Sequence, residues 1–171
     1  MKSKSQIWVI SDTHFGHHNI IKYCSRPYSG PTEMDWDIVE KWNSVVKPQD
    51  KVYHLGDVYM GCSNGYAENI LSKLNGHKRL ILGNHDSGQD KLLHRYFDKI
   101  DIWRMFPEFG LLLTHVPVHE SALYRGKTDK QLKNIHGHIH QNKSPDGPYQ
   151  CVCVEQINYT PVNIEELRLT N

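Results

Sequence analysis

Residues 7–14 read IWVISDTH, an apolar run that stops at a serine and continues into Asp12-Thr13-His14. A short apolar run bounded by polar residues is typical of a buried strand. In an extended segment, residues i and i+2 point the same way. We therefore expect Asp12 and His14 to present two ligand atoms to a common space directly after a buried strand.

Four further predicted strands also end in polar residues. They cover residues 51–55, 79–82, 109–114 and 133–136, and the blocks that follow or end them contain Asp57, Asn84-His85-Asp86, His115 and His138-Ile139-His140. Ligand-binding loops gather at the carboxyl ends of strands in sheet proteins. Five such endings in one chain predict one shared site.

The remaining pattern predicts mixed α/β layers with a substantial sheet. Apolar residues at helical spacing predict helices over 33–46 and 66–74, between the early strands. The second half reads as strand-rich, over residues 100–106, 150–156 and 162–167 in addition to the strands named above. A length of 171 residues favours one domain.

Composition narrows the function classes. The formal net charge is +1, whereas a protein that holds long nucleic acid through phosphate contacts usually has a basic excess. No apolar run is long enough to span a bilayer and no secretory segment is evident, so the expected location is cytoplasmic. The four cysteines are expected to be small buried residues or free thiols. The chain has 12 histidines, a residue common in metal binding and acid–base chemistry, so their positions in the sequence must decide between these roles and a structural one.

The strand endings combine carboxylate, imidazole and amide oxygen, a donor set that suits Mn, Fe, Co, Ni or Zn. Cysteine is absent from the set, which argues against a closed structural zinc site. Glycines at positions 56, 83 and 137 allow sharp turns or close backbone approach beside the ligands. Each block alone is weak, because a lone Asp-x-His or Gly-Asn-His-Asp is more often a surface turn. Their joint occurrence after successive strands favours a metal site.

These blocks give the chain a resemblance to the calcineurin-like metallophosphoesterase superfamily. That family's pattern runs Asp-x-His, Gly-Asp, Gly-Asn-His-Asp/Glu, His and Gly-His-x-His, and all five blocks occur here between residues 12 and 140. The stretch DTHFGH at 12–17 is similar to a compact subset common in bacteria and their phages. The resemblance implies that residues 1–171 form a single metallophosphoesterase domain, a four-layer α-β-β-α sandwich of two mixed sheets flanked by helices.

The resemblance also implies roles for individual residues. Asp12, His14 and His140 would bind a first ion, Asn84, His115 and His138 a second, and Asp57 would bridge them. His85 would act as acid or transition-state stabiliser, with Asp86 orienting it. One departure is that many members carry a second acid or an arginine shortly after the bridging aspartate, where this chain has Val58-Tyr59-Met60-Gly61.

Substrate contacts are a weaker inference. His17, His18 and Asn19 follow the first ligand pair and could line the pocket, with exposed loop residues as the alternative. Arg26 could hold a phosphate bidentately, with a surface salt bridge as the alternative. Tyr59 follows the bridging aspartate and could touch a base or sugar.

The preferred function is a dinuclear metal-dependent phosphoesterase, in particular a phosphodiesterase that cleaves a small or nucleotide-like diester by metal-activated hydroxide with His85 assisting. Two divalent ions are expected, with Mn preferred and Fe, Zn, Ni or Co as alternatives. Alternative functions are a phosphomonoesterase, a protein phosphatase, a nuclease or a non-catalytic metal-binding scaffold. The expected partner is a phosphate ester, with no membrane and no long nucleic acid, and a homodimer is left open.

Overall fold

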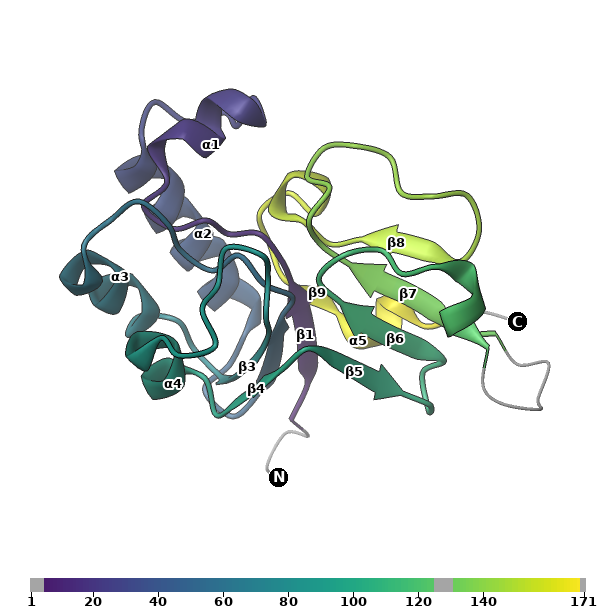
Figure 1. The fold of residues 1–171 in the computed structure, drawn as a ribbon. Coiled ribbons are helices and arrows are strands. Elements are labelled where there is room, and N and C mark those ends of the chain that lie inside the picture. The colour runs from purple at the N-terminus through teal and green to yellow at the C-terminus, as the bar shows by residue number, and fades with distance from the viewer. Residues whose placement is uncertain (1–4, 125–130, 170–171) are drawn as a thin grey trace.

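The computed structural model describes residues 5–124 and 131–169, which form two sheets packed face to face (Figure 1). The first sheet has the order β4-β3-β2-β1-β9. Four of its strands run parallel, and β9 pairs antiparallel with β1. Their bounds are β1 Ile7–Ile10, β2 Lys51–His54, β3 His77–Ile81, β4 Lys99–Asp101 and β9 Val162–Asn163.

The second sheet has the order β5-β6-β7-β8. Strand β5 is antiparallel to β6, whereas β6, β7 and β8 run parallel to one another. Both sheets are therefore mixed. The strand bounds are β5 Trp103–Phe106, β6 Leu111–Thr114, β7 Lys133–His136 and β8 Tyr149–Cys151.

An apolar core fills the space between the two sheets. One buried cluster contains Val9 and Ile81 of the first sheet and Leu55 directly after β2. Leu113 and Ile135 of the second sheet belong to the same cluster. The short helix α5 (Ile164–Leu167) adds the buried side chains Ile164 and Leu167 to this cluster. Alternation along each strand sends these residues inward.

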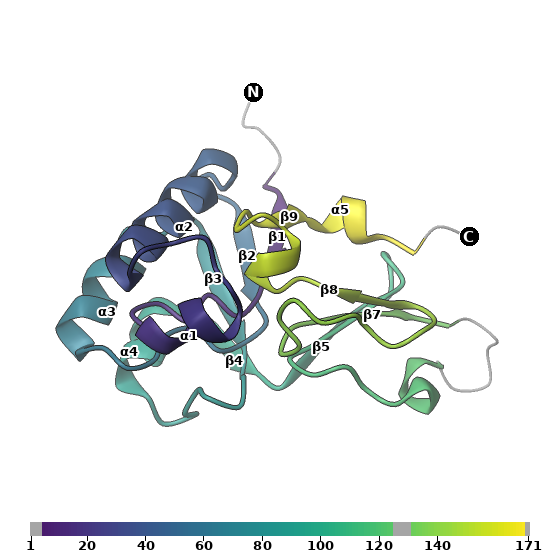
Figure 2. The same ribbon diagram turned by 90° about the horizontal axis from the view of Figure 1, so that it is seen from above.

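Four helices cover the outer face of the first sheet (Figure 2). They are α1 His18–Tyr23, α2 Pro31–Val45, α3 Asn64–Leu71 and α4 Lys91–Tyr96, and they build a second apolar cluster around Met34, Trp42 and Leu80. The outer face of the second sheet has a thinner cover. There the 3-10 helix η1 (Glu120–Leu123) places Leu123 against Leu112.

The prediction of two mixed sheets flanked by helices is confirmed. Three local predictions were wrong. The predicted strand 100–106 divides at Ile102 into β4 and β5, which belong to different sheets. Residues 164–167 form helix α5 instead of a strand, because the Asn163 side chain caps the helix by accepting a hydrogen bond from the Glu165 backbone. The predicted strand 150–156 ends at Cys151, and Val154–Gln156 is the 3-10 helix η2.

Strand register brings the polar strand endings together. Ile10 pairs with His54, and beyond that pair the Asp12 N–H donates to the Gly56 carbonyl at 3.0 Å. In the second sheet the Gly137 N–H donates to the His115 carbonyl at 2.7 Å. The loops that carry the candidate ligands therefore lie side by side. None of the helices in the described parts of the chain has the length and apolar character that crossing a bilayer requires.

Candidate metal centre

Two clusters of potential ligand atoms share the carboxylate of Asp57. One contains Asp12, His14 and Asp57, and the other contains Asp57, His115 and His138. Asp57 Oδ2 lies 3.5 Å from His14 Nε2 and also 3.5 Å from His115 Nε2. The same oxygen thus faces one imidazole from each cluster, which is the arrangement that a bridging carboxylate requires.

Buried polar atoms without partners mark the first cluster. Among the described residues, Asp12 Oδ1 and both ring nitrogens of His14 make no hydrogen bond, although both side chains are almost fully buried. Asp12 Oδ1 lies 3.8 Å from His14 Nε2 and 3.7 Å from His140 Nε2. Unpaired buried polar groups are costly, so an ion that these atoms coordinate accounts for their arrangement. The residues present therefore fit a divalent cation.

The second cluster converges on the side-chain oxygen of Asn84. Asn84 Oδ1 lies 2.8 Å from His115 Nε2 and 2.9 Å from His138 Nδ1. His115 Nδ1 lies 2.7 Å from the Leu55 carbonyl oxygen and donates its proton there. That hydrogen bond leaves the Nε2 lone pair facing Asn84 and Asp57, as a metal ligand requires.

The backbone at the ligands is unusual. Five of the seven candidate ligands have positive φ without being glycine: Asp12 (59°), His14 (49°), Asp57 (57°), His138 (72°) and His140 (50°). The expectation of an extended backbone through the Asp-x-His and His-x-His pairs was therefore wrong. Each such residue costs roughly 1–3 kcal/mol, and such strain concentrates at functional sites.

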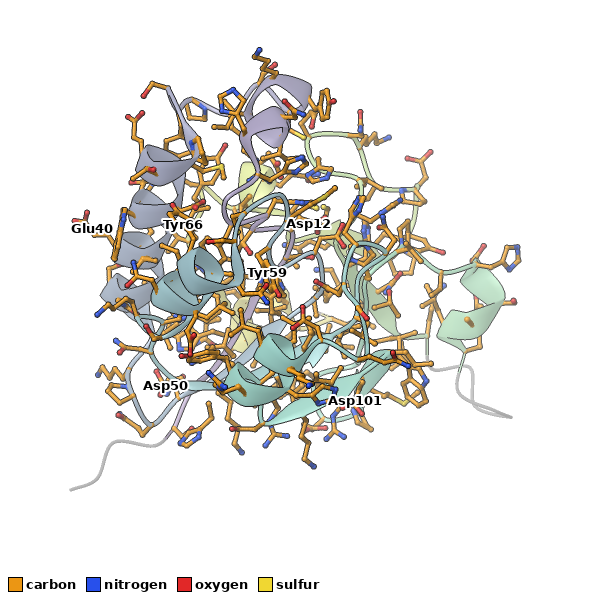
Figure 3. The ribbon with its side chains drawn as sticks, turned by 60° about the vertical axis from the view of Figure 1, so that its left-hand side comes forward. Asp12, Glu40, Asp50, Tyr59, Tyr66 and Asp101 are labelled. Carbon is orange, nitrogen blue, oxygen red and sulfur yellow. The ribbon has the colours of Figure 1, made fainter. Side chains whose placement is uncertain are left out.

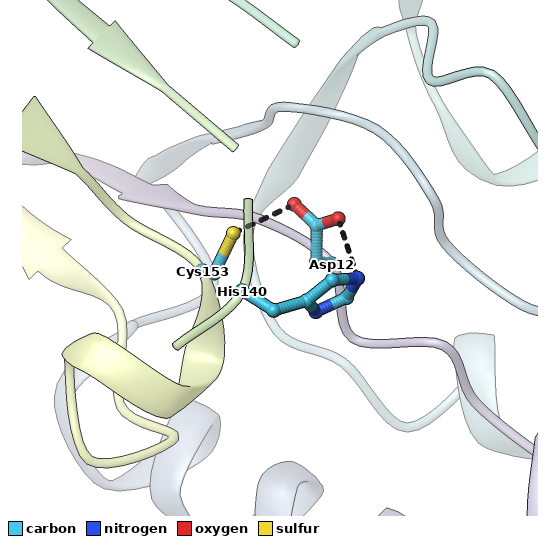
Figure 4. A group of neighbouring side chains, drawn as sticks. All are labelled: Asp12, His140 and Cys153. Atoms are coloured by element: carbon cyan, nitrogen blue, oxygen red, sulfur yellow. Dashed lines mark hydrogen bonds and ion pairs between the residues drawn. The ribbon is translucent and has the colours of Figure 1, made fainter. Parts of the chain in front are cut away.

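His140 is held by residues that the sequence did not single out. Its Nδ1 lies 3.1 Å from Glu155 Oε1, and its Nε2 faces Asp12 (Figure 4). Cys153 approaches the same carboxylate from the other side, with Sγ 3.2 Å from Asp12 Oδ2. Neither Glu155 nor Cys153 stands in a motif, so only the packing of the C-terminal segment identifies them.

Hydrogen bonds set the charge state of this region. Burial opposes ionisation of Asp12, but the neighbouring imidazoles of His14 and His115, together with hydrogen bonds from the Ser11 hydroxyl and the His138 backbone N–H, hold the pKa of its carboxyl well below the usual range. Burial lowers the pKa of His54 to about 3. His54 is therefore neutral, accepts from the Gly56 N–H at 3.2 Å and lies 2.9 Å from Thr13 Oγ1. This buried imidazole joins the first two ligand loops.

His85 and Asp86 follow Asn84 but face different surroundings. His85 is exposed, and its ring centroid lies 5.7 Å from that of His14. Asp86 was expected to orient His85. Its carboxylate instead accepts hydrogen bonds from the backbone N–H groups of Asp57, Val58 and Gly83 at 2.8–3.0 Å. Asp86 therefore braces the loop that carries Asp57, and its expected contact with His85 is corrected.

A polar recess of about 480 Å³ opens beside the first cluster. His14, His85 and His140 line it together with His17 and Asn19, two of the predicted substrate residues. His18, the third of that group, is exposed at the start of α1 and is not among the lining residues. Met60 and Tyr23 also line the recess, and no sequence signal pointed to them.

Two predicted substrate residues are used inside the protein. Arg26 is 4% exposed and donates to the carbonyls of Asp12 and Thr13 at 2.7 and 2.9 Å, while it also pairs with Glu155. Its guanidinium is therefore not available to a phosphate. Tyr59, whose side chain is labelled in Figure 3, donates a hydrogen bond from its hydroxyl to Asp90, the capping residue of α4. The roles predicted for Arg26 and Tyr59 are corrected, because their polar atoms are already bound.

Fold and site together define a class of protein, a metallophosphoesterase with its candidate ligands at adjoining edges of two mixed sheets. The family model for calcineurin-like phosphoesterases matches residues 5–168, so the chain belongs to that family.

Several relatives are similar over most of their length. An uncharacterized protein of Methanocaldococcus jannaschii is 37% identical over 171 residues, which cover 95% of this chain and 89% of the relative. The Gene 66 protein of Mycobacterium phage L5 is 38% identical over 169 residues, covering 80% of this chain and 78% of the relative. The crystal structure of a protein of unknown function from Aquifex aeolicus has a TM-score of 0.74 at 29% identity, with 96% and 98% of the two chains covered.

Proposed function

We propose that this phosphoesterase is a phosphodiesterase that works with two divalent metal ions. The observation that carries the proposal is the position of Asp57 Oδ2, 3.5 Å from His14 Nε2 on one side and 3.5 Å from His115 Nε2 on the other. A single carboxylate oxygen between two imidazoles suits a pair of ions better than one ion.

The ligand sets follow from the two clusters. The first ion would be held by Asp12, His14, His140 and the shared Asp57. The second would be held by the same aspartate with Asn84, His115 and His138. The set mixes carboxylate, amide oxygen and imidazole, which suits Mn as well as Fe, Co, Ni or Zn, and Mn is the metal that we would test first.

Such ions would bind phosphate oxygens as Lewis acids. They would also lower the pKa of a water enough for it to lose a proton and act as the nucleophile toward phosphorus. The chain supplies the rest. Among the described residues, the His85 side chain makes no hydrogen bond, and it lines the polar recess beside His14. An imidazole in that position can give a proton to the leaving alkoxide. Its backbone N–H donates to Asp57 Oδ1 at 2.9 Å, which ties it to the shared carboxylate.

A diester is preferred over a monoester on charge. The described residues that line the polar recess include neither lysine nor arginine, and Arg26 is committed to Glu155 and to backbone carbonyls. A terminal phosphate carries close to two charges and would favour a bidentate arginine clamp. A diester carries one charge and needs no such clamp beyond the metal ligands.

The test is hydrolysis of bis(p-nitrophenyl) phosphate and p-nitrophenyl phosphate by protein loaded with Mn and checked by metal analysis. We expect faster diester turnover. Asp57→Asn should lose both bound metal and activity, whereas Asp101→Asn, an exposed acid on β4, should keep both. His85→Ala should keep its metal, and its loss of turnover should be larger for a diester with an alkoxide leaving group than for the p-nitrophenyl esters, whose leaving group needs no proton. No turnover with Mn, Fe, Zn, Ni or Co would contradict the proposal and favour a non-catalytic scaffold.

A further inference from the structure

A second recess lies beside the other half of the metal centre. It has a volume of about 590 Å³ and shares Asn84 and His115 with the proposed ligand set of the second ion. Its remaining wall comes from the segments after β3 and before β5, from β5 and β6, and from the segment after β6. It includes Ile102, Trp103 and Val116. The polar recess shares His14 and His140 with the proposed ligand set of the first ion. The metal centre is thus flanked by two recesses of different character.

The apolar character of this recess has a structural cause. Trp103 and Met105 pair across strands with Thr114 and Leu112, so one face of β5 and β6 carries all four side chains. That face is the outer face of the second sheet, where Leu112 packs against Leu123 of η1. Among the described residues, η1 contributes only the small side chain of Ala122 to the lining of the recess.

Large apolar side chains consequently remain open to solvent there. Ile102 is 71% exposed, Trp103 54% and Val116 43%. The described lining contains no aspartate, glutamate, lysine or arginine, and its polar members are Asn84, Thr114 and His115. The Thr114 hydroxyl is already bonded to the Val116 carbonyl at 2.6 Å. The described wall therefore presents a ligand with an apolar surface that includes one indole ring, that of Trp103.

We propose, on the basis of the function proposed above, that this recess binds the nucleobase of a nucleoside phosphodiester. Because Asn84 and His115 belong both to the recess and to the ligand cluster, a phosphate held at the second ion would direct one ester arm into the recess. A planar uncharged base suits an apolar wall with an exposed tryptophan, and stacking on an aromatic side chain contributes about 1–3 kcal/mol per base. The volume falls within the range of about 300–1,000 Å³ common for small-molecule sites.

The kinetic test compares two substrates with one leaving group, the p-nitrophenyl ester of thymidine 5′-phosphate and methyl p-nitrophenyl phosphate. Trp103→Ala should lower the ratio of their kcat/KM values by roughly tenfold, the loss of one stacked base. Trp36→Ala is the matched control, since Trp36 is 41% exposed on α2 and does not line the recess. An unchanged ratio in Trp103→Ala would overturn the proposal.

A binding test separates this proposal from the proposed function. AMP should shift the indole N–H resonance of Trp103, assigned with Trp103→Phe, whereas ribose 5-phosphate should not. If the wild type hydrolyses neither diester but AMP still shifts that resonance, the proposed function fails and the recess assignment stands. If neither probe shifts it, the assignment fails.

Self-association is the competing explanation for the exposed apolar side chains. Sedimentation of the wild type and of Trp103→Ala distinguishes it. Monomers in both cases support a ligand site. A dimer that Trp103→Ala dissociates would show that this face is an interface between copies, and would overturn the proposal.

Discussion

Glu155 accepts a hydrogen bond from Nδ1 of His140 at 3.1 Å, while the opposite nitrogen of that ring faces Asp12 Oδ1 at 3.7 Å. The carboxylate of Glu155 thereby fixes the tautomer and orientation of a candidate metal ligand. Arg26 holds Glu155 in turn, with Nη2 2.7 Å from Oε1. The chain Arg26–Glu155–His140 connects the segment after β8 to the first ligand cluster.

Glu155→Gln should weaken metal binding without unfolding the protein. The neutral amide removes the charge that makes His140 a stronger base, and loss of such an outer partner typically lowers metal affinity about 10–100-fold. Titration of the metal-free protein with Mn should show weaker binding at one of two sites. Glu166→Gln, an exposed residue of α5, is the matched control and should bind Mn like the wild type. Equal affinities in both variants would contradict the orienting role.

Arg26→Ala should be strongly destabilising. It leaves the buried carboxylate of Glu155 without its cation, a change that costs about 3–5 kcal/mol in comparable buried pairs. It also removes the donors to the carbonyls of Asp12 and Thr13. Urea unfolding gives the free energy. Arg95→Ala removes the partner of Glu68 from an exposed ion pair and should cost no more than about 1 kcal/mol. A similar decrease in the free energy of unfolding in the two variants would show that the Arg26–Glu155 pair contributes as little as a surface ion pair.

Gly56→Ala should disrupt the site through the backbone. Gly56 has φ +100°, and a Cβ there would lie 2.5 Å from the backbone N of Gly83 and 2.7 Å from Nδ1 of His115. We expect a loss of about 2–4 kcal/mol in the free energy of unfolding, from the left-handed backbone and the clash together. In α3, a Cβ on Gly65 meets nothing within 4 Å. Gly65→Ala should therefore be neutral or stabilising by up to about 1 kcal/mol. A Gly56→Ala variant of wild-type stability would contradict the close packing of these loops.

Titration of Asp35 should lower the free energy of unfolding as pH rises from about 4 to about 6. Burial raises the pKa of Asp35 to about 6, while Oδ2 accepts hydrogen bonds from the Gly16 N–H and the Tyr66 hydroxyl. Because the native pKa exceeds the unfolded value, the native state holds the proton more tightly and loses that advantage as pH increases. Asp35→Asn removes the titration. Its stability relative to the wild type should rise between pH 4 and pH 7, by up to roughly 3 kcal/mol in urea unfolding. A difference independent of pH would show that the carboxyl titrates alike in both states.

Much of the fold was predictable from local pattern. Apolar runs that end in polar residues located β1, β2, β3, β6 and β7 to within a few residues, because a buried strand needs apolar side chains and its end needs a turn. Boundaries within continuous apolar stretches were not predictable in this way. Residues 100–106 contain both β4 and β5, and only the packing of two sheets divides them at Ile102.

The sequence by itself determined which side chains can serve as ligands and in what order they follow the strands. That information is local, since strand endings and glycine turns depend on neighbouring residues. The tertiary structure decided which polar groups remain available. Arg26 and Glu155 are 129 residues apart, and their hydrogen bond uses a guanidinium that the sequence alone would offer to a phosphate. Such pairs depend on how distant segments pack, so no local pattern records them. The position of Asp57 between two imidazoles likewise depends on how the two sheets meet, and the exposure of Trp103 depends on how little covers the outer face of the second sheet.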